Sequence, residues 1–502
     1  MEQVVNLAKR RGFVFPSAEI YGGLGGFWDW GPLGVLLKNN IKREWWKTFV
    51  QQRDDVVGID GAIITNPKVW EASGHVKSFN DVLVECKWCK RRFKADDKFV
   101  LDEHIVEEVV QHVKEKKRKE AVAEAARKKL LEEGVISHGR FFLAEALLKE
   151  LHGSDDRLVE NKVDELLKGD VYRNLYSEKR QFNTMFKTFA GPAEDTASVA
   201  YLRPETAQNI FVNYELVRDT MRLKLPFGIA QIGKAFRNEI TPGHFVFRSR
   251  EFEQMEIEYF VLSGTDDEWF DKWVTACEQW FFDLGIKKAS LRLRKQLKEG
   301  LAHYAKATTD IEYAFPIEKG WAELTGISNR QDYDLKQHGE FARKDAEAFA
   351  TAVDDGAKVK KVPYVIEPSF GVDRAALAFL LDAYEEQKDR VVLKLHPKLA
   401  PYTVAVFPLL ANKPQLVEKA REVFKLLQPR FMTAWDDRGN VGKRYYSQDE
   451  IGTPWCVTID FDTLEGKKRP KGTVTVRDRD SMEQENVVIE ELPAYLAKKL
   501  AA

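Results

Sequence analysis

The spacing of apolar residues divides the chain into segments of different kinds. VLLKNNIKREWWKTFVQQ, entered through Pro32 and Gly34, has apolar positions at helical intervals, and the run from Val56 to Pro67 reads as a buried strand ended by a proline. From Phe182 to Phe260, aromatic and β-branched residues alternate with turn residues, which predicts a mainly antiparallel sheet. Between Cys86 and Arg180, dense Lys, Arg and Glu at helical spacing indicate an inserted helical module. We favour solvated faces over RNA-binding surfaces for these helices.

The segments after Phe260 predict the rest of the first domain and, beyond Leu395, a second domain. Helices are expected at Asp266 to Leu284 and at Asp345 to Val353, with strands at GWAELTGI and KVPYVIEPSFG. After Leu395, a β run, a helix from Lys413 to Leu427 and strands at WCVTIDFD and GTVTVRDR alternate as in an α/β domain of about 100 residues. We therefore predict an α+β domain with an antiparallel sheet in residues 1–85 and 181–395, a helical insertion at 86–180, and a separate α/β domain at 396–502.

Composition agrees with a multidomain protein and limits its partners. The 502 residues exceed what one core organises, and the near balance of 78 basic and 79 acidic residues gives a net charge of −1. A polyanion would therefore have to be bound by local basic clusters. No apolar run approaches the roughly 20 residues of a membrane span, and MEQVVNLAKRRGF lacks the apolar core of a secretory signal. We expect a cytoplasmic protein that does not enter a membrane.

Four cysteines in 502 residues indicate reduced thiols and no disulfide framework. Cys86 and Cys89 have the spacing of half a zinc ribbon, but the absence of a second C-x-x-C excludes a four-thiolate site. Only His104 or His112 could supply further ligands nearby. From the sequence we favour a pair of reduced thiols and regard bound zinc as the lesser alternative.

The best candidate for a nucleotide site is the pair of predicted strands around Thr241 to His244. GGLGG, at 22–26, lacks the Gly-Lys-Ser/Thr that completes a P-loop and reads as a turn. The T-P-G-H loop suits two antiparallel strands, and alternation would place Arg237 and Glu239 on one face. The strand after the loop would present the following residues on one face: Arg248, Arg250, Phe252, Gln254, Glu256 and Glu258. Such a surface suits ATP, and an exposed face of cross-strand ion pairs would look the same.

A second unusual pattern is GVDRAALAFLLDAY, from Gly371 to Tyr384, which reads as a helix with one apolar face. Arg374 lies on or beside that face, so it requires either an internal carboxylate or a ligand phosphate. Glu205, Glu323 and Glu367 could merely favour a helix start or pair with the arginines. In a functional site, they would hold Mg²⁺ or a substrate ammonium.

Three segments in this order resemble the signature motifs of class II aminoacyl-tRNA synthetases. Residues 31–67 are similar to motif 1, 236–260 to motif 2 and 371–384 to motif 3. The local sequence is most similar to the dimeric glycyl-tRNA synthetase family, in the segments FVFPSAEIYGG, WDWGPLG, SGHVKSFND, LRPETAQ, FRNEITP, REFEQMEIEYF and EPSFGVDR. The resemblance covers nearly the whole chain. It implies a class II catalytic domain, a C-terminal anticodon-binding domain, and a homodimer that attaches glycine to its tRNA through glycyl-adenylate.

The same resemblance implies roles for individual residues. Arg237 and Arg374 would be catalytic, the first on the α-phosphate of ATP and the second on the γ-phosphate side. The ATP site would comprise Arg237, Asn238, Glu239, Phe247, Arg248, Ser249, Arg250, Glu251, Phe252, Glu323, Leu324, Gly371, Val372, Asp373 and Arg374, with Mg²⁺ at Glu323. The glycine site would comprise Lys94, Glu205, Phe252, Glu253, Gln254, Met255, Glu256, Glu367, Pro368, Ser369, Phe370 and Gly371.

Two qualifications accompany these roles. In RRFKADD this chain has Lys94 where arginine is more usual in the family, and lysine keeps the charge but loses the guanidinium fork, which puts its substrate-binding role in doubt. Two alternatives also remain open: a class II synthetase for another amino acid, such as proline, histidine or threonine, and a non-catalytic relative that binds nucleic acid.

Overall fold

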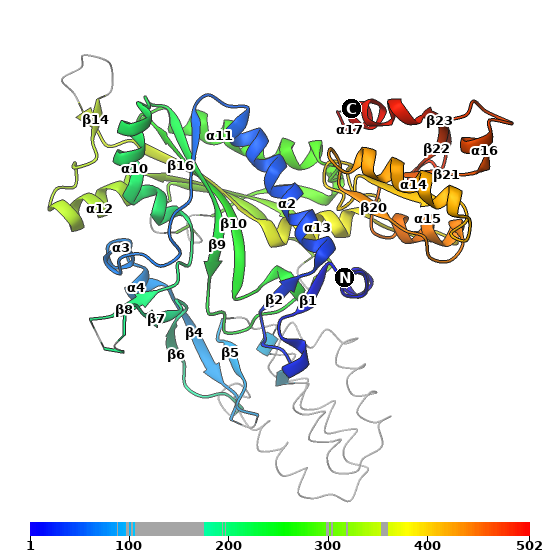
Figure 1. The fold of residues 1–502 in the computed structure, drawn as a ribbon. Helices are drawn as coiled ribbons and strands as arrows, with labels where there is room; N and C mark the ends of the chain where they lie inside the picture. Colours follow the sequence, from blue (N-terminus) through cyan, green and yellow to red (C-terminus); the bar gives the residue numbers. More distant parts are fainter. Residues whose placement is uncertain are drawn as a thin grey trace, which may run out of the picture. The chain divides into compact units, whose positions relative to one another are not determined.

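The computed structural model describes residues 1–87, 89–96, 100–101, 104–105, 175–192, 194–195, 197–297, 301–302, 305–317, 320–352 and 360–501 (Figure 1). These residues form two compact units, which are described separately. Unit 1 comprises Met1–Ser73, Lys187–Phe236 and Gly243–Ala502, and unit 2 comprises Gly74–Phe186 with Arg237–Pro242. Most of the helical insertion expected at 86–180 lies outside the described residues.

Unit 1 is built on a seven-stranded sheet in the order β11-β12-β13-β16-β10-β9-β3. Its strands are β3 (Val56–Ile59), β9 (Phe227–Phe236), β10 (Glu251–Val261), β11 (Leu291–Lys295), β12 (Ala307–Tyr313), β13 (Ala322–Gln331) and β16 (Tyr364–Gly371). All neighbours are antiparallel except β3 and β9, which run parallel. The mainly antiparallel sheet predicted from the sequence is confirmed.

Helices pack on both faces of this sheet. The long helices are α2 (Pro32–Trp46), α10 (Ala207–Met221), α11 (Asp266–Asp283), α12 (Tyr333–Arg343) and α13 (Val372–Ala383). Apolar residues of α2, α11 and α13 share one core with Met255, Ile257 and Tyr259 of β10. A second core joins α10 and α12 to Phe260 of the same strand. Strand β10 therefore contributes alternate residues to the two faces, as strand geometry requires.

The remaining elements of unit 1 before its C-terminal part are short. They are α1 (Glu2–Arg11), β1 (Val14–Pro16), β2 (Trp28–Trp30), α3 (Lys68–Ala72), β7 (Lys187–Phe189), β8 (Val199–Tyr201), β14 (Thr351–Ala352), β15 (Lys360–Lys361), β17 (Tyr384–Glu386) and β18 (Val391–Leu393). Single turns of other helix types lie at Glu19–Tyr21, Lys47–Gln51, Phe245–Phe247 and Lys288–Ser290.

Two local predictions for unit 1 are wrong. The strand expected from Val56 to Pro67 ends at Ile59, because the chain then leaves the ladder: the Gly61 N–H donates to the Gln231 side chain at 2.7 Å and the Gly61 carbonyl accepts from Arg203 at 2.7 Å. The helix expected at Asp345–Val353 is absent from its described part. Helix α12 ends before it at Lys344, whose φ is 57°, and Asp345 accepts the Glu347 N–H in a turn.

The C-terminal part of unit 1, orange to red in Figure 1, is an α/β fold as expected. Its sheet has the order β20-β19-β21-β22-β23, parallel among the first three strands and antiparallel beyond them. The elements are β19 (Val404–Pro408), α14 (Pro414–Leu427), β20 (Thr433–Trp435), α15 (Val441–Asp449), β21 (Trp455–Ile459), α16 (Phe461–Glu465), β22 (Thr473–Asp478), β23 (Gln484–Val488), a turn at Ile489–Glu491 and α17 (Leu492–Ala501).

Unit 2 contains a three-stranded antiparallel sheet in the order β5-β4-β6, preceded by the short helix α4 (His75–Ser78). Its strands are β4 (Asn80–Glu85), β5 (Arg92–Lys94) and β6 (Arg180–Asn183). In neither unit is any described helix both long and apolar enough to span a bilayer.

Candidate active site

Acidic side chains gather on one face of β10 and on the elements beside it. Gln254, Glu256 and Glu258 point away from the apolar core that holds Met255 and Ile257. Antiparallel pairing with β16 sets Glu256 opposite Ser369, and pairing of β13 with β16 sets Ser328 opposite Glu367. Register therefore assembles the site from strands far apart in the sequence.

Glu256 is held at both carboxylate oxygens. The Thr206 hydroxyl donates to Oε2 at 2.5 Å, and the Ser369 hydroxyl donates to Oε1 at 2.7 Å. Only 1% of Glu256 is exposed, and this burial, followed by the charge of Glu205, raises the pKa of its carboxyl above the ordinary value. The two hydroxyls act in the opposite direction, and they fix the position of a carboxyl that water barely reaches.

Arg330 joins two acidic residues of the same region. It donates through Nε and Nη2 to Asp334 at 2.7 and 2.9 Å, and through Nη1 to Glu367 Oε1 at 2.8 Å. Gln208 extends the network by donating to Glu205 at 3.0 Å and to Asp334 at 3.1 Å. Arg330, Asp334 and Glu367 are all buried, so this network is rigid as well as charged.

We call Glu205, Glu256, Glu258, Asp334 and Glu367 the acidic cluster. Burial, followed by the charges of Glu256 and Glu205, raises the pKa of Glu367 to about 8 although Arg330 opposes this. Burial and the charge of Glu367 raise the pKa of Glu258 well above its ordinary range. Neither carboxyl oxygen of Glu258 has a hydrogen-bond partner.

Arg330 forms ion pairs with two members of the acidic cluster, Asp334 and Glu367. Burial and neighbouring carboxylates raise the pKa of Glu256, Glu258 and Glu367, so these three carboxyls hold a proton more readily than an ordinary glutamate does. Oxygens of Glu256, Glu258 and Glu367 lie within 4.8 Å of one another, which is close enough for a metal ion or for the N–H donors of an ammonium. The acidic cluster thus has the charge and spacing that a small cation requires.

A second group surrounds Arg374 at the start of α13. Arg374 stacks over the Phe247 ring, with its guanidinium carbon 4.5 Å from the ring centroid, and donates through Nε to the Phe247 carbonyl at 3.1 Å. Its Nη1 lies 3.1 Å from the Glu323 carbonyl and 3.4 Å from the Glu323 carboxylate. The internal carboxylate that the sequence allowed is therefore present. The arginine side chain remains 28% exposed, so a ligand can still reach it.

Carboxyl groups also lie around Glu323. A β-carbon added at Gly326 would sit 3.6 Å from Glu323 Oε1 and 3.9 Å from Asp310 Oδ1, so these two oxygens flank the same glycine. Burial raises the pKa of Asp310, Gln296 opposes this, and the charge of Glu323 adds to the increase. The Glu323 side chain is half-exposed and Asp310 is buried, and carboxylate oxygens are the ligands that Mg²⁺ prefers.

A third group of predicted residues forms an ion network on the opposite face of β10. Lys38 of α2 contacts Asp373 at 2.9 Å and Glu253 at 3.1 Å, and Lys42 contacts Glu253 at 2.9 Å. Burial alone would lower the pKa of Lys38, but the charges of Asp373 and Glu253 outweigh it and raise the pKa. Glu253 therefore ties α2 to β10, Asp373 ties α2 to α13, and neither side chain joins the acidic cluster.

The connection between β9 and β10 differs from the expected tight hairpin. The strands end at Phe236 and begin again at Glu251, so Arg237, Glu239, Arg248 and Arg250 do not lie on strands. The cause is the buried turn Phe245–Phe247, which packs into the core next to backbone of positive φ at His244 and Phe245. Burying three consecutive apolar residues is incompatible with continued strand alternation.

Part of this connection belongs to unit 2. There the Asn238 N–H donates to the Thr184 carbonyl at 2.7 Å, the Glu239 N–H donates to the Arg237 carbonyl at 2.7 Å, and the Arg237 guanidinium lies over the Phe79 ring at 5.5 Å. Lys94, on β5 of the same unit, pairs with Asp81 at 2.8 Å. These groups are positioned within unit 2.

Arg250, in the part of the connection that belongs to unit 1, holds the glycine-rich turn. Its side chain donates to the Gly25 carbonyl at 2.7 Å, and its N–H donates to the Gly26 carbonyl at 2.7 Å. Gly22, Gly23 and Gly26 have positive φ, so the turn interpretation is confirmed. The turn lies against the motif 2 connection through Arg250.

The predicted residues thus separate by location. Those with side chains in the acidic cluster or bonded to it are Glu205, Gln254, Glu256, Glu367 and Ser369. Those around Arg374 are Phe247 and Glu323. Those whose side chains are buried in the apolar core are Leu324, Met255, Phe370 and Val372. Phe252, Pro368 and Gly371 lie along β10 and β16, Ser249 precedes β10, and Glu251 pairs with Lys234 at its start.

Sequence reasoning missed Arg330, Asp334, Thr206 and Gln208. Arg330 is one arginine near the end of β13, and no spacing distinguishes it before the fold pairs it with β16. Thr206 and Gln208 stand beside Glu205 in RPETAQ, so the composition of that segment was the available signal. Glu258 was placed on the right face but was not assigned to the site.

Two family models match parts of this chain. Residues 186–384 match the family described as the tRNA synthetase class II core domain (G, H, P, S and T), and residues 403–499 match the family described as the anticodon binding domain. Proteins named glycine–tRNA ligase from Alkaliphilus metalliredigens and Bacillus thuringiensis subsp. konkukian are each 48% identical over 505 aligned residues, covering 100% of this chain and 98% and 99% of theirs. A relative of the same name from Geobacillus kaustophilus is 47% identical over 512 aligned residues, covering 100% of this chain and 99% of its own.

Proposed function

The chain belongs to the glycine–tRNA ligase family, and we infer that its acidic cluster receives the ammonium group of the substrate glycine. Members of this family are class II synthetases that use ATP to attach glycine to tRNA. The glycine carboxylate attacks the α-phosphate of ATP, giving glycyl-adenylate and pyrophosphate. The terminal adenosine of the tRNA then takes the glycyl group.

The observation that carries this inference is the convergence of three buried carboxyls, those of Glu256, Glu258 and Glu367, within the acidic cluster. An ammonium brings one positive charge and three N–H donors, which matches a site where Glu256, Glu258 and Glu367 oxygens lie within 4.8 Å of one another. Glu258, whose oxygens have no hydrogen-bond partner, supplies vacant acceptors there. A metal ion would also be attracted, but the class II chemistry requires that an amino acid be held beside ATP.

Selection of glycine follows from the rigidity of the same groups. Glycine has no side chain to grip, so the site has to bind its charged ends and exclude a β-carbon, which is easier than rejecting a smaller substrate. Hydroxyls of Thr206 and Ser369 fix Glu256 from both sides, and Arg330 fixes Glu367. Carboxyl groups fixed by these hydrogen bonds cannot move aside to make room for a β-methyl group such as that of alanine.

We assign ATP to Arg237 and Arg374. The resemblance to motifs 2 and 3 supports the assignment, and so does the half-exposed guanidinium of Arg374 beside a ring and the start of a helix. No side-chain nucleophile is required, because positioning and charge stabilisation supply the catalysis. Glu323 and Asp310 would hold Mg²⁺, which neutralises charge on the phosphates when bound.

Glycine-dependent exchange of pyrophosphate into ATP tests the proposal without tRNA. We expect exchange with glycine and little with alanine or the other eighteen amino acids. Arg237→Ala should reduce exchange sharply, whereas Arg430→Ala, at an exposed arginine of the C-terminal part, should leave it unchanged. Near-normal exchange in Arg237→Ala would refute the assignment of that residue. Exchange driven by another amino acid, or none in the wild type, would refute the substrate or the activity itself.

We also propose that the enzyme is a homodimer that works in the cytoplasm. The dimer is supported by the similarity of residues 31–67 to motif 1, which forms the dimer interface of class II enzymes. Val35 on α2 is an apolar side chain that is 43% exposed, as an interface position would be in a single chain. Analytical ultracentrifugation at micromolar concentration should give twice the mass of the chain, and a monomer would contradict this proposal.

A further inference from the structure

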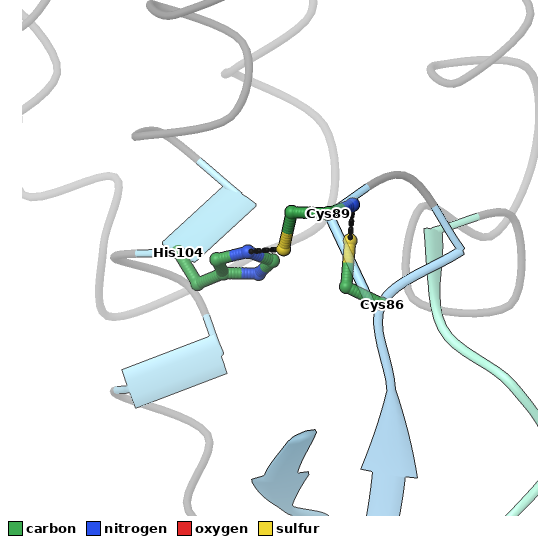
Figure 2. Close-up of side chains that lie close together, drawn as sticks. All are labelled: Cys86, Cys89 and His104. Atoms are coloured by element: carbon green, nitrogen blue, oxygen red, sulfur yellow. Dashed lines mark hydrogen bonds between the residues drawn. The ribbon is translucent and has the colours of Figure 1, made fainter. Parts of the chain in front are cut away.

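Unit 2 brings three metal-ligating side chains to one point. Ligand atoms of Cys86, Cys89 and His104 all lie within 4.8 Å of one another, and Figure 2 shows the imidazole turned toward the two sulfurs. Cys86 and His104 are buried, the histidine to 2% exposure, and Cys89 is half-buried. Buried polar groups of this kind require partners, and a metal ion is one that would satisfy all three together.

The backbone around the two cysteines forms a tight turn. The Lys90 N–H donates to the Cys86 carbonyl at 3.0 Å, and Lys90 has a φ of 64°, in the left-handed region. This turn directs the Cys89 N–H at Cys86 Sγ, 3.4 Å away. Arg91 donates its Nε–H to Cys89 Sγ at 3.4 Å. Both sulfurs therefore accept an N–H donor, an arrangement that suits thiolates, and thiolates are the form that binds metal.

The His104 imidazole is oriented by Tyr176, which lies 72 positions further along the chain. The Tyr176 hydroxyl donates its one proton to the Leu101 carbonyl at 2.9 Å. Its contact with His104 Nδ1, at 2.8 Å, is then one in which the hydroxyl accepts and Nδ1–H donates. In the neutral ring this leaves the lone pair of Nε2 directed at Cys89 Sγ, 3.3 Å away. Metal-binding histidines commonly have this second hydrogen bond, which fixes the tautomer.

The spacing fits a tetrahedral ion. Zinc bonds of about 2.3 Å to sulfur and about 2.0 to 2.1 Å to nitrogen place a sulfur and a nitrogen ligand roughly 3.6 Å apart in tetrahedral geometry. The observed separation of Cys89 Sγ and His104 Nε2, 3.3 Å, is a few tenths of an ångström shorter. A thiol donating to the imidazole would give a similar distance, so the two arrangements must be separated by experiment.

We propose that Cys86, Cys89 and His104 bind a Zn²⁺ ion, with a solvent oxygen in the fourth position. This reverses the expectation from the sequence, which showed half a ribbon and could not show that the fold delivers His104. The other candidate ligand, His112, lies outside the described residues. Two thiolates and one imidazole favour zinc over hard ions such as Mg²⁺. The backbone of Cys86 bridges to Tyr176, so the ion would fasten three chain segments of unit 2.

The first test is the metal content of the full-length protein, purified without chelator under reducing conditions. We expect stoichiometric zinc in the wild type, a loss of most of it in Cys89→Ser, and full retention in Cys277→Ala. Cys277 is a matched control because it is a buried cysteine of unit 1 on α11, outside the cluster. Wild-type protein that contains no zinc and takes up none when zinc is added would overturn the proposal.

The second test does not depend on a ligand variant that folds. Replacing zinc with Co²⁺ should give the visible absorption of tetrahedral thiolate coordination, together with a sulfur-to-metal charge-transfer band. Tyr176→Phe keeps the aromatic packing but removes the hydroxyl that orients His104, so zinc should be lost to a competing chelator at about 10- to 100-fold lower chelator concentration. Octahedral cobalt spectra or equal affinity in Tyr176→Phe would each contradict the site. Because these readouts do not use ATP or glycine, they are independent of the proposed activity.

Discussion

The proposed glycine site predicts that glycine binding depends on pH, because Glu367 belongs to the acidic cluster. Burial, followed by the charges of Glu256 and Glu205, raises the pKa of its carboxyl from the ordinary 4.5 to about 8. At neutral pH it is therefore mostly protonated. An ammonium beside it stabilises the carboxylate, so binding of glycine has to release this proton. The affinity for glycine should consequently fall as the solution becomes more acidic.

The size of the effect follows from the same pKa. With a pKa of about 8, the ionised fraction of Glu367 falls about fivefold from pH 8 to 7 and about ninefold from pH 7 to 6, so the KM for glycine in the exchange reaction should rise about 50-fold from pH 8 to pH 6. Saturating ATP keeps the nucleotide site filled during the measurement. Calorimetry in buffers of different ionisation enthalpy should show uptake of the released proton by the buffer near pH 7.

Glu367→Gln is the matched control, since it keeps the shape but cannot titrate. Its KM should be higher than that of the wild type at pH 8 and nearly independent of pH. For the unliganded protein, the stability that comes from keeping Glu367 neutral is present below about pH 4.5 and is lost as pH rises through about 8. The thermal midpoint of the wild type should then fall relative to Glu367→Gln between about pH 4.5 and 8 and level off above about pH 8. A wild-type KM that is flat between pH 6 and 8 would refute this account.

Three further variants probe other contacts. Arg330→Met should lower the free energy of unfolding by about 3 to 5 kcal/mol, because it leaves two buried carboxyls unpaired, and a loss below about 1 kcal/mol in chemical denaturation would contradict the network. Gly34→Ala should cost about 1 to 3 kcal/mol, because its β-carbon would lie 1.9 Å from the Phe13 carbonyl oxygen, whereas Gly442→Ala, with its nearest contact at 3.5 Å, should not destabilise α15. Arg374→Lys should reduce kcat/KM for ATP at least about tenfold in the exchange assay, because lysine keeps the charge and loses the planar fork, and an unchanged value would exclude phosphate binding by Arg374.

The elements with strong periodicity could be read from the sequence. Helices α2, α11 and α14 were expected near their observed bounds, because each has an apolar stripe at helical spacing and a proline or acidic residues at its start. The alternation along β10 likewise gave the correct faces from Phe252 onward. These features depend on local sequence, and local sequence is sufficient where tertiary contacts reinforce it.

The features that were missed depend on contacts between distant segments. Arg330 joins the acidic cluster only through the pairing of β13 with β16, and His104 reaches Cys89 only through the packing of unit 2. The connection from Arg237 to Arg250 looked like a hairpin because the local sequence does not show that its apolar turn, Phe245–Phe247, leaves the strand and packs into the core. Such contacts can be recovered from one sequence only by resemblance to a known family.

The alternation along β10 constrains how this enzyme can change over time. Glu256 and Glu258 share the strand with Met255 and Ile257, so positions of the acidic cluster alternate with positions of the apolar core. Inserting or deleting one residue before Gln254 would turn the acids into the apolar layer and bring the apolar residues to the face of the acidic cluster. Substitutions can therefore adjust the site one residue at a time, while a one-codon frame-preserving insertion there would abolish both the fold and the reaction. Length variation in descendants should be confined to connections outside this strand.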